Sequence, residues 1–484
     1  MRELTQYALG TARKRGAKYA DIRILDSRSQ LINTRNGEIV ANDNVDSFGF
    51  GVRVLVDGAW GFAASAKVEK KEIERTTLLA VRIAKASASL KTKGVRLAPE
   101  PACDDRWQTP CVIDPFEVPL EKKLDLMLRI DGILRKDKRI SVAACSMNFR
   151  KKHQWLATSE GAFINQLLIR SGVGYAATAV KGAEAQVRSY PASFRGQFMS
   201  MGYEMVEGMP LVENAARTRE EAIALLTAPQ CPSGKTNLLL EGHQMALQIH
   251  ESTGHPTELD RVIGMEANFA GTSFLTTEKL GKFRYGSNIV NLVADSTAPC
   301  GLGTIGYDDD GVRAQRWHLV KDGVFAGYQT SREVAHACGE TRSRGCCRAD
   351  SWAGVPMVRN TNISLMPGDW KRDDLIADTK KGILMATNKS WSIDQKRLNF
   401  QFGTEIAWEI KNGKIGRIFK NPTYQGITPE FWGSCDAICD EDDWVLWGVA
   451  SCGKGQPMQV AEMSHGASTT RFRNVTVGVV KKNI

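Results

Sequence analysis

The spacing of apolar and polar residues predicts a mixture of amphipathic helices and half-buried strands at the start of the chain. Residues 3–15 and 70–87 carry apolar side chains at helical spacing. The strand-like runs between these two helices are 19–25, 29–36, 47–56 and 59–64. Asn36-Gly37 and Asp57-Gly58 are dipeptides typical of two-residue hairpin turns, so the strands should pair as antiparallel hairpins.

The next part of the chain repeats this order. Pro119 begins a helical pattern that continues to about residue 135, and residues 211–226 form a second one. The strand-like runs between them are 140–150, 153–159, 162–180 and 183–188. The repeated order indicates an internal duplication, although two independent α+β segments would give the same pattern. Residues 90–118 lack periodicity and predict a long surface crossing.

The pattern changes after Ala228-Pro229. A short strand at 236–240 precedes a helix, and short alternating runs with frequent Gly, Asp, Asn and Thr then follow. We therefore predict an α+β protein of two domains. The first, residues 1–229, is an antiparallel sheet with flanking helices, and the second, residues 230–484, is a mainly antiparallel-β domain that carries the functional site.

Composition places the chain among ordinary globular proteins. Its 484 residues are 42% apolar and 24% charged. No run of 18 or more apolar residues is present, which argues against a membrane-spanning helix. The first 25 residues lack the apolar centre of a signal peptide, so we expect a cytoplasmic protein.

Charge and cysteine content narrow the class further. The net charge is +10, but basic and acidic residues are interleaved, which disfavours a nucleic acid partner. The eleven cysteines are an odd number and include no C-x-x-C pair, so they are expected to be reduced thiols.

One stretch, GHQMALQIHESTGHP at residues 242–256, has the composition of a metal site. It places His250, Glu251 and His255 in the spacing H-E-x-x-x-H. In a regular α-helix, residues five apart point about 140° away from each other, so the two imidazoles would diverge. The spacing therefore predicts a π-type turn, which Gly254 would permit before Pro256 ends the helix.

Two imidazoles beside a carboxylate favour a metal-activated water, with Glu251 as the general base. The alternative is that two of the seven histidines lie close together by chance. A metal that opens a position to water needs at least one more protein ligand. Cys452, in the glycine-rich stretch SCGKGQP, is the best candidate, and Lys454 would favour its thiolate. A loop cysteine without a role is the competing interpretation.

Other polar residues are weaker candidates. His465 could bind an oxyanion or the substrate, but a histidine in a surface loop explains it equally well. Tyr307 and the three aspartates after it, 308–310, could form an acidic metal site, although such a string is more often a solvated turn. The arginines at 342, 344 and 348 could grip a peptide or form a solvated basic loop.

Several longer motifs resemble those of one family. They are HESTGH followed by ELD, GTSF, GTIGYDDDGV, LVKDGVFAGY, NTNISLMPG and CGKGQP, with NGEIVANDNVDSFGFGVRVLVDGAWGFAA in the first half. Together they resemble the TldD/PmbA family of metallopeptidases, once described as modulators of DNA gyrase. The H-E-x-x-x-H box points to the TldD side of that family.

The resemblance carries implications for the site and the partners. It implies Zn²⁺ held by His250, His255 and Cys452, with Glu251 as the base. It also implies a two-domain subunit in a homodimer, or in a heterodimer with a PmbA-type subunit, that cleaves unfolded peptides. An extended peptide could add to a sheet edge and bind through its backbone, which would give broad sequence tolerance.

We therefore predict a zinc-dependent peptidase that hydrolyses peptide bonds in unfolded or extended peptides. The main alternative is a non-catalytic peptide-binding or regulatory partner subunit with a structural metal. A gyrase-associated DNA-binding protein is a third hypothesis, suggested only by the older family name and the +10 charge.

Overall fold

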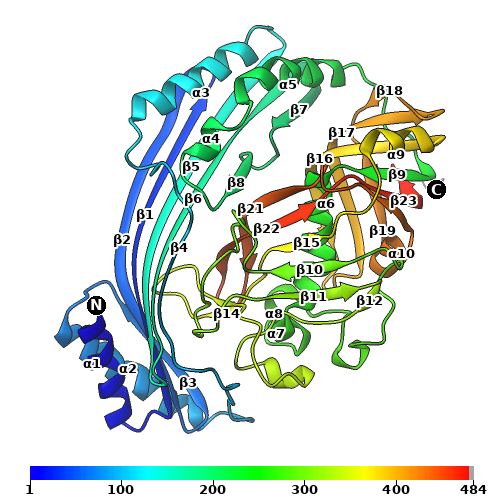
Figure 1. The fold of residues 1–484 in the computed structure, drawn as a ribbon. Helices are drawn as coiled ribbons and strands as arrows, with labels where there is room; N and C mark the ends of the chain where they lie inside the picture. The colour runs from blue at the N-terminus through cyan, green and yellow to red at the C-terminus, as the bar shows by residue number, and fades with distance from the viewer. Residues whose placement is uncertain (479–484) are drawn as a thin grey trace.

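A computed structural model describes residues 1–478. It has a mixed α+β fold in which one long curved sheet lies beside a more compact group of shorter strands (Figure 1). No helix within the described range is both long and apolar enough to cross a membrane. The predicted α+β class, with antiparallel sheets in both parts of the chain, is confirmed.

The curved sheet has eight strands, and six of them follow the order β3-β2-β1-β5-β6-β4, with β7 and β8 also pairing with β6. Their bounds are β1 Tyr19–Arg35, β2 Glu38–Val56, β3 Ala59–Ser65, β4 Asp104–Gln108, β5 Ile140–Thr158, β6 Phe163–Lys181, β7 Glu184–Tyr190 and β8 Gln197–Met199. The helices of this part are α1 Arg2–Lys14, α2 Lys70–Ala88, α3 Leu120–Leu134, α4 Glu204–Glu207 and α5 Leu211–Leu225.

The two long hairpins correct the prediction of paired short strands. Residues 19–25 and 29–36 are parts of the single strand β1, because the polar residues between them continue both ladders. Asp26, for example, lies opposite Phe48 of β2 and His153 of β5. A polar residue fits such a strand wherever one face of the sheet is solvated, so polar interruptions in the sequence do not end it.

The predicted duplication is visible in the order of elements. α1, β1, β2, β3 and α2 are matched by α3, β5, β6, β7 and α5. The first pair of helices covers one end of the sheet and the second pair covers the other end (Figure 1). The predicted hairpin turns are also present, with positive φ at Asn36 (53°) and Gly37 (86°). The crossing at 90–118 is not entirely irregular, because β4 within it runs parallel to β6.

The second half contains a seven-stranded sheet, a four-stranded sheet and two two-stranded ribbons. The strands are β9 Gly234–Leu240, β10 Leu292–Asp295, β11 Arg316–Lys321, β12 Val324–Phe325, β13 Cys347–Arg348, β14 Met357–Val358, β15 Ile363–Leu365, β16 Lys381–Ile393, β17 Asn399–Lys411, β18 Lys414–Phe419, β19 Thr423–Ile427, β20 Cys435–Ile438, β21 Val445–Lys454, β22 Gln459–Ala467 and β23 Thr470–Val477. The α-helices are α6 Gly242–Ile249, α7 Leu259–Val262, α8 Ala267–Ala270, α9 Arg372–Asp378 and α10 Thr428–Gly433.

α6 is anchored by the core of this half. Met245 and Ile249 on the helix belong to one buried apolar cluster with Leu238 and Leu240 of β9, the strand that precedes it. Burying each such side chain contributes about 1.5–3 kcal/mol, so the end of α6 is held in a fixed place. The segment that follows, which contains the H-E-x-x-x-H motif, is therefore rigidly positioned.

The aspartates at 308–310 join the two halves and do not form the solvated turn or the metal site that we considered. Asp309 pairs with Arg23 of β1 at 3.0 Å, and Asp310 pairs with Arg53 of β2 at 2.7 Å. All four side chains are almost completely buried. The acidic string supplies Arg23 with its carboxylate and gives Arg53, which also pairs with Asp21 of β1, a second one.

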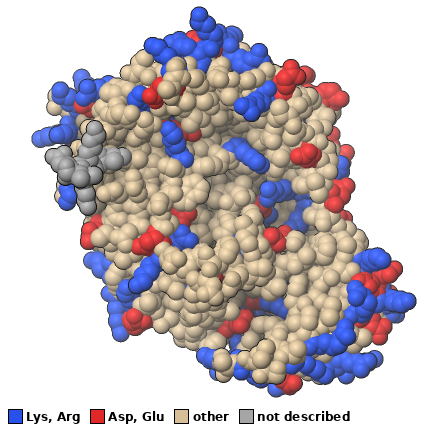
Figure 2. All heavy atoms as spheres, turned by 180° about the vertical axis from the view of Figure 1, so that it is seen from behind, with Lys and Arg blue, Asp and Glu red and all other residues tan. Residues whose placement is uncertain are grey.

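Charged groups are mixed on the face shown in Figure 2. Lys and Arg alternate with Asp and Glu around its edge, and a few basic side chains line a hollow near its centre. This face offers no continuous basic track of the kind that duplex DNA would require.

Candidate metal centre

The backbone after α6 takes the form that the five-residue spacing demands. α6 ends at Ile249, His250–Gly254 form a π-helical turn, and His255–Thr257 form a 3₁₀ turn. The predicted π-type turn is thus confirmed. Gly254 has an ordinary helical φ of −58°, so the turn does not need glycine for its backbone angle. It needs the small residue for close packing, because a Cβ at this position would lie 2.9 Å from the Asn360 side chain.

Three side chains converge beside this turn. One potential ligand atom from each of His250, His255 and Cys452 lies within 4.8 Å of the others. Cys452 Sγ is 3.4 Å from His255 Nε2, and the two imidazole centroids are 4.7 Å apart. The glycine-rich stretch around Cys452 is not an exposed loop, because the residue lies in β21 and is 4% exposed.

His250 is held from behind by His465. Nδ1 of His465 lies 3.1 Å from the carbonyl of Ile363, and a carbonyl can only accept, so this nitrogen carries the proton. Nε2 of His465 then accepts from Nδ1 of His250 at 2.8 Å. The chain of hydrogen bonds leaves the lone pair of His250 on Nε2. His465 is fully buried in β22, so it is not the surface-loop residue that the sequence allows, and both of its ring nitrogens are engaged.

His255 is held by a carboxylate. Its Nδ1 donates to Glu258 at 2.8 Å, which leaves the Nε2 lone pair facing Cys452. Glu258 is fully buried and lies 3.3 Å from Lys454 Nζ and 3.5 Å from Arg261. Lys454 also contacts Asp260 at 2.7 Å. Carboxylates behind ligating imidazoles fix the tautomer and increase the basicity of the ligand nitrogen.

The site favours the deprotonated forms that metal ions bind. Burial lowers the pKa of both His250 and His255. Burial alone would raise the pKa of the Cys452 thiol, but the contact with His255 and the nearby Arg359 bring it below its usual value. Lys454, expected from the sequence to favour this thiolate, instead donates to Asp260 and to the carbonyl of Val358 and lies within ion-pair distance of Glu258.

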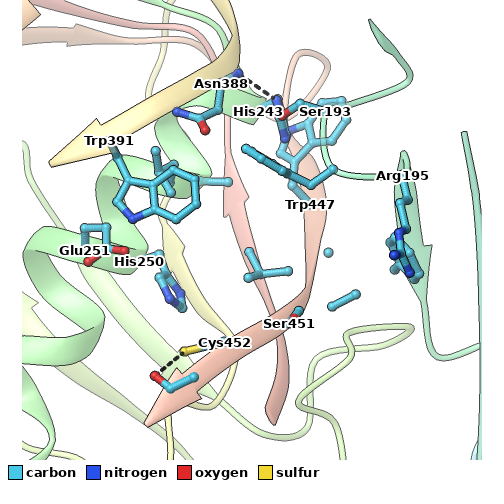
Figure 3. A pocket seen from close by; sticks show the side chains of 18 of the residues that line it. Ser193, Arg195, His243, His250, Glu251, Asn388, Trp391, Trp447, Ser451 and Cys452 are labelled. Atoms are coloured by element: carbon cyan, nitrogen blue, oxygen red, sulfur yellow. Dashed lines mark hydrogen bonds between the residues drawn. The ribbon is translucent and has the colours of Figure 1, made fainter. Parts of the chain in front are cut away.

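Glu251 lies beside His250 at the wall of the same cavity (Figure 3). It accepts from Arg397 at 3.1 Å, and its side chain is 7% exposed. Arg397 belongs to the turn between β16 and β17 and has a left-handed φ of 62°. The arginine therefore fixes the direction of the carboxylate at the cavity wall.

The cavity has a volume of about 640 Å³, large enough for several residues of an extended peptide. Trp391 and Trp447 give it an apolar wall, and Cys452 and His250 point into it (Figure 3). Residues 447–453 of β21 line it along their length. In the described part of the chain, β22 is the only strand that pairs with β21. On β21, Gln197 of β8 bonds the backbone of Leu446 and Gly448, and Arg359 donates to the carbonyl of Cys452.

The three arginines that the sequence offers as peptide-binding candidates, 342, 344 and 348, lie in different environments. Arg342 is exposed and pairs with Glu100, and Arg344 pairs with Glu340 four residues away. Both fit the solvated basic loop that we considered. Arg348 differs, because it lies in a cavity wall and donates to backbone carbonyls of Glu462 and Asn360.

Comparison with known proteins places this geometry in a family. Residues 233–479 match the model of the PmbA/TldA metallopeptidase C-terminal domain. Residues 20–84 match domain 1 of the same family, and residues 113–226 match its central domain. The chain belongs to the PmbA/TldA metallopeptidase family. The predicted family is thus confirmed.

Relatives of this PmbA/TldA chain are named as metalloproteases. A metalloprotease of Methanocaldococcus jannaschii is 29% identical over 92% of this chain and 94% of its own length. A metalloprotease TldD homolog of Haemophilus influenzae is 28% identical over 76% of this chain and 74% of its own. A zinc metalloprotease TldD homolog of Saccharolobus solfataricus is 22% identical over 96% and 98%. These names support a metallopeptidase function in general.

Solved structures share the PmbA/TldA fold. A protein of Thermotoga maritima described as a modulator of a DNA gyrase superposes with a TM-score of 0.77, at 17% identity, over 99% of this chain and 100% of its own. TldE of Thermococcus kodakarensis gives a TM-score of 0.71 at 18% identity, over 98% and 99%.

Sequence reasoning missed two residues of the site. Glu258 follows His255 by three positions, and this spacing could have identified it as a carboxylate behind the imidazole. Arg397 carries no such signal, because it is 146 residues from Glu251 in the chain.

Proposed function

We propose that this protein is a zinc-dependent peptidase that hydrolyses peptide bonds in unfolded or extended peptides. The observation that carries the proposal is the convergence of ligand atoms from His250, His255 and Cys452 within 4.8 Å, with Glu251 on the wall of the same cavity. Catalytic zinc sites use three protein ligands drawn from His, Cys and acidic residues and keep a fourth position for water or substrate.

The chain's own residues suit this chemistry. His250 and His255 would offer Nε2, and Cys452 would offer its thiolate, because the other ring nitrogens already bond to His465 and Glu258. Bound zinc would supply Lewis acidity and lower the pKa of a water molecule. Glu251, directed by Arg397, would take a proton from that water and return it to the leaving amine.

The shape of the cavity supports an extended substrate. A peptide laid beside residues 449–451 of β21 would hydrogen-bond through its backbone, while Trp391 and Trp447 would contact side chains. A segment must be extended and free of partners of its own to fit the cavity in this way, so the site would select unstructured segments.

We also propose that the working unit is a dimer, with a second copy or with a PmbA-type subunit as partner. The likeness to a protein named TldE supports a two-subunit arrangement. Light scattering of the purified chain, alone and mixed with a PmbA-type subunit, distinguishes the two partners by mass. A monomer in both samples would refute this part.

Glu251→Gln tests the proposed reaction. The amide keeps the shape of the side chain but cannot take a proton, so cleavage of an unfolded protein should fall by at least a hundredfold. The zinc content and the unfolding curve should match those of the wild type. If cleavage continues at the wild-type rate, Glu251 is not the base.

The same variant separates the peptidase from a regulatory subunit with a structural metal. A zinc-loaded wild-type protein that binds unfolded peptides but cuts none would favour the regulatory alternative.

A further inference from the structure

A second cavity, of about 510 Å³, lies between the curved sheet and the β21–β22 ribbon. It is separate from the metal-centre cavity but shares Arg150 and Ser451 with it as wall residues. Ser451 directly precedes Cys452. The ladder between β21 and β22 shifts register between Val449 and Cys452, a bulge of the kind often found beside active sites. The two cavities are therefore neighbours across one strand.

The wall of this second cavity carries an excess of positive charge. Six cations contribute to it: Arg28, Arg150, Lys151, Lys152, Arg170 and Arg348. Arg28 pairs with Asp46 and Lys151 pairs with Asp114. Glu462 of β22 is the carboxylate that faces them, and it pairs with both Arg150 and Arg170. Two further carboxylates on the wall are engaged elsewhere. Asp309 pairs with the buried Arg23, and Asp350 lies exposed at the edge and bonds to Ser351.

Lys152 and Arg348 have no carboxylate within ion-pair distance in the described structure. The Lys152 ammonium reaches the Ala349 carbonyl at 3.5 Å, and Arg348 donates to the carbonyls of Glu462 and Asn360. The Nε of Arg170 is buried without a partner. Lys152 and Arg348 are both half-buried and so lose part of their hydration without a directly paired carboxylate, a cost that an anion in the cavity would offset.

The ionisation of these groups agrees with that view. Burial lowers the pKa of Lys152 to about 8. Burial, followed by repulsion from Arg170 and Arg359, lowers the pKa of Arg348 to about 10. A bound anion would oppose both shifts.

We propose that this cavity binds a carboxylate of the peptide whose scissile bond lies at the metal centre. The proposal rests on the peptidase function and adds a substrate class to it: extended peptides with a negative charge a few residues from the cleaved bond. The carboxylate is either the α-carboxylate of the peptide or an Asp or Glu side chain. A peptide along β21 that passes Ser451 enters this cavity next.

The geometry favours a carboxylate among anions. Guanidinium N–H groups match the two oxygens of a carboxylate, the Nε of Arg170 has no partner in the described structure, and Lys152 adds an ammonium donor. Every linear peptide with a free C-terminus carries this group. Binding it would place a substrate relative to the zinc by one end, whereas β21 would hold the backbone without regard to sequence.

The test uses matched peptides that differ only in charge. One pair has a free C-terminal carboxylate or a C-terminal amide, and a second pair, amidated in both members, has Asp or Asn at each position after the cleaved bond in turn. The wild type should cleave the charged member of one pair with a kcat/KM at least tenfold higher, because a charge-assisted hydrogen bond is gained. The pair that shows the preference identifies the source of the carboxylate.

Variants then locate the preference. Lys152→Met should bring the ratio of charged to neutral peptide close to one, and Lys152→Arg should retain it. Lys181→Met, an exposed lysine at the end of the same β5–β6 hairpin, should leave the ratio unchanged. Equal cleavage of both members by the wild type, or a full preference in Lys152→Met, would overturn the proposal.

Binding measurements keep this test independent of the reaction. The same peptides are titrated into the Glu251→Gln protein by calorimetry, and the charged member should bind at least tenfold more tightly. Failure of cleavage with the binding preference intact would reject the peptidase and retain the anion site. Equal affinities would reject the anion site whatever the rate of cleavage.

Discussion

The two imidazoles of the metal centre are supported in opposite ways. His250 is supported by neutral groups only. It donates a hydrogen bond to His465, which in turn donates one to the carbonyl of Ile363. His255 is supported by charged groups, in which Glu258 is embedded among Lys454 and Arg261. Both arrangements orient a ring nitrogen toward the third candidate ligand, so orientation alone does not require charge.

The two sets of supporting contacts differ in how much they contribute to the stability of the fold. The neutral set is a pair of hydrogen bonds, each worth about 1 kcal/mol net. The ionic cluster is buried, and loss of one partner leaves opposite charges uncompensated, which costs about 3–5 kcal/mol. We therefore expect the His255 side to couple zinc binding to folding, and the His250 side to tune affinity alone.

Glu258→Gln should produce the largest effect. The free energy of unfolding, measured with a chelator present, should fall by about 3 kcal/mol, because Lys454 keeps Asp260 but loses Glu258. Zinc affinity, measured by competition with a chromophoric chelator, should fall roughly tenfold to hundredfold.

Two controls sharpen this prediction. Glu409→Gln breaks an exposed pair with Arg417 and should leave the unfolding midpoint unchanged. Adding Lys454→Met to Glu258→Gln should cost less than the sum of the two single changes, because each removes the other's partner. Full additivity would show that the cluster does not act as a unit.

His465→Ala should be intermediate. Zinc affinity should again fall roughly tenfold to hundredfold, since the tautomer of His250 is no longer fixed. The free energy of unfolding without metal should fall by only about 1–3 kcal/mol. His465→Gln, whose amide oxygen can still accept from His250, should recover part of the affinity. A stability loss as large as that of Glu258→Gln would erase the contrast between the two supports.

Arg397→Met should have the smallest effect, and it should appear in kcat. Glu251 loses the donor that directs it, so kcat should fall roughly tenfold while the zinc content stays the same. The matched control is Lys396→Met, at the exposed preceding residue. Loss of zinc in Arg397→Met would mean that the arginine supports the ligands and not the base.

The sequence predicted elements whose signal is local. The helical stripe at 70–87 became α2, Lys70–Ala88, and Asn36-Gly37 formed its turn. The π-turn is predictable because a regular α-helix cannot bring two residues five positions apart, His250 and His255, to the same face. Domain limits at 229/230 and a cytoplasmic location stay predictions.

The parts of the fold and site that the sequence did not predict depend on contacts between segments far apart in the chain. For Asp309 and Asp310 the sequence predicts a solvated turn or an acidic metal site, because their partners, Arg23 and Arg53, lie more than two hundred residues earlier. Cys452 and His465 were placed in loops, whereas the glycine-rich stretch forms a buried ribbon with its neighbour strand. Glycine signals a turn only where no tertiary packing requires the close approach of another segment.

The zinc content of Cys452→Ala tests the central claim most directly. Both proteins are loaded with zinc, exchanged into buffer with a weak chelator, and analysed by mass spectrometry for metal per chain. We predict about one zinc per chain in the wild type and almost none in the variant, with the same far-UV circular dichroism. A variant that keeps one zinc per chain would contradict the site formed by His250, His255 and Cys452.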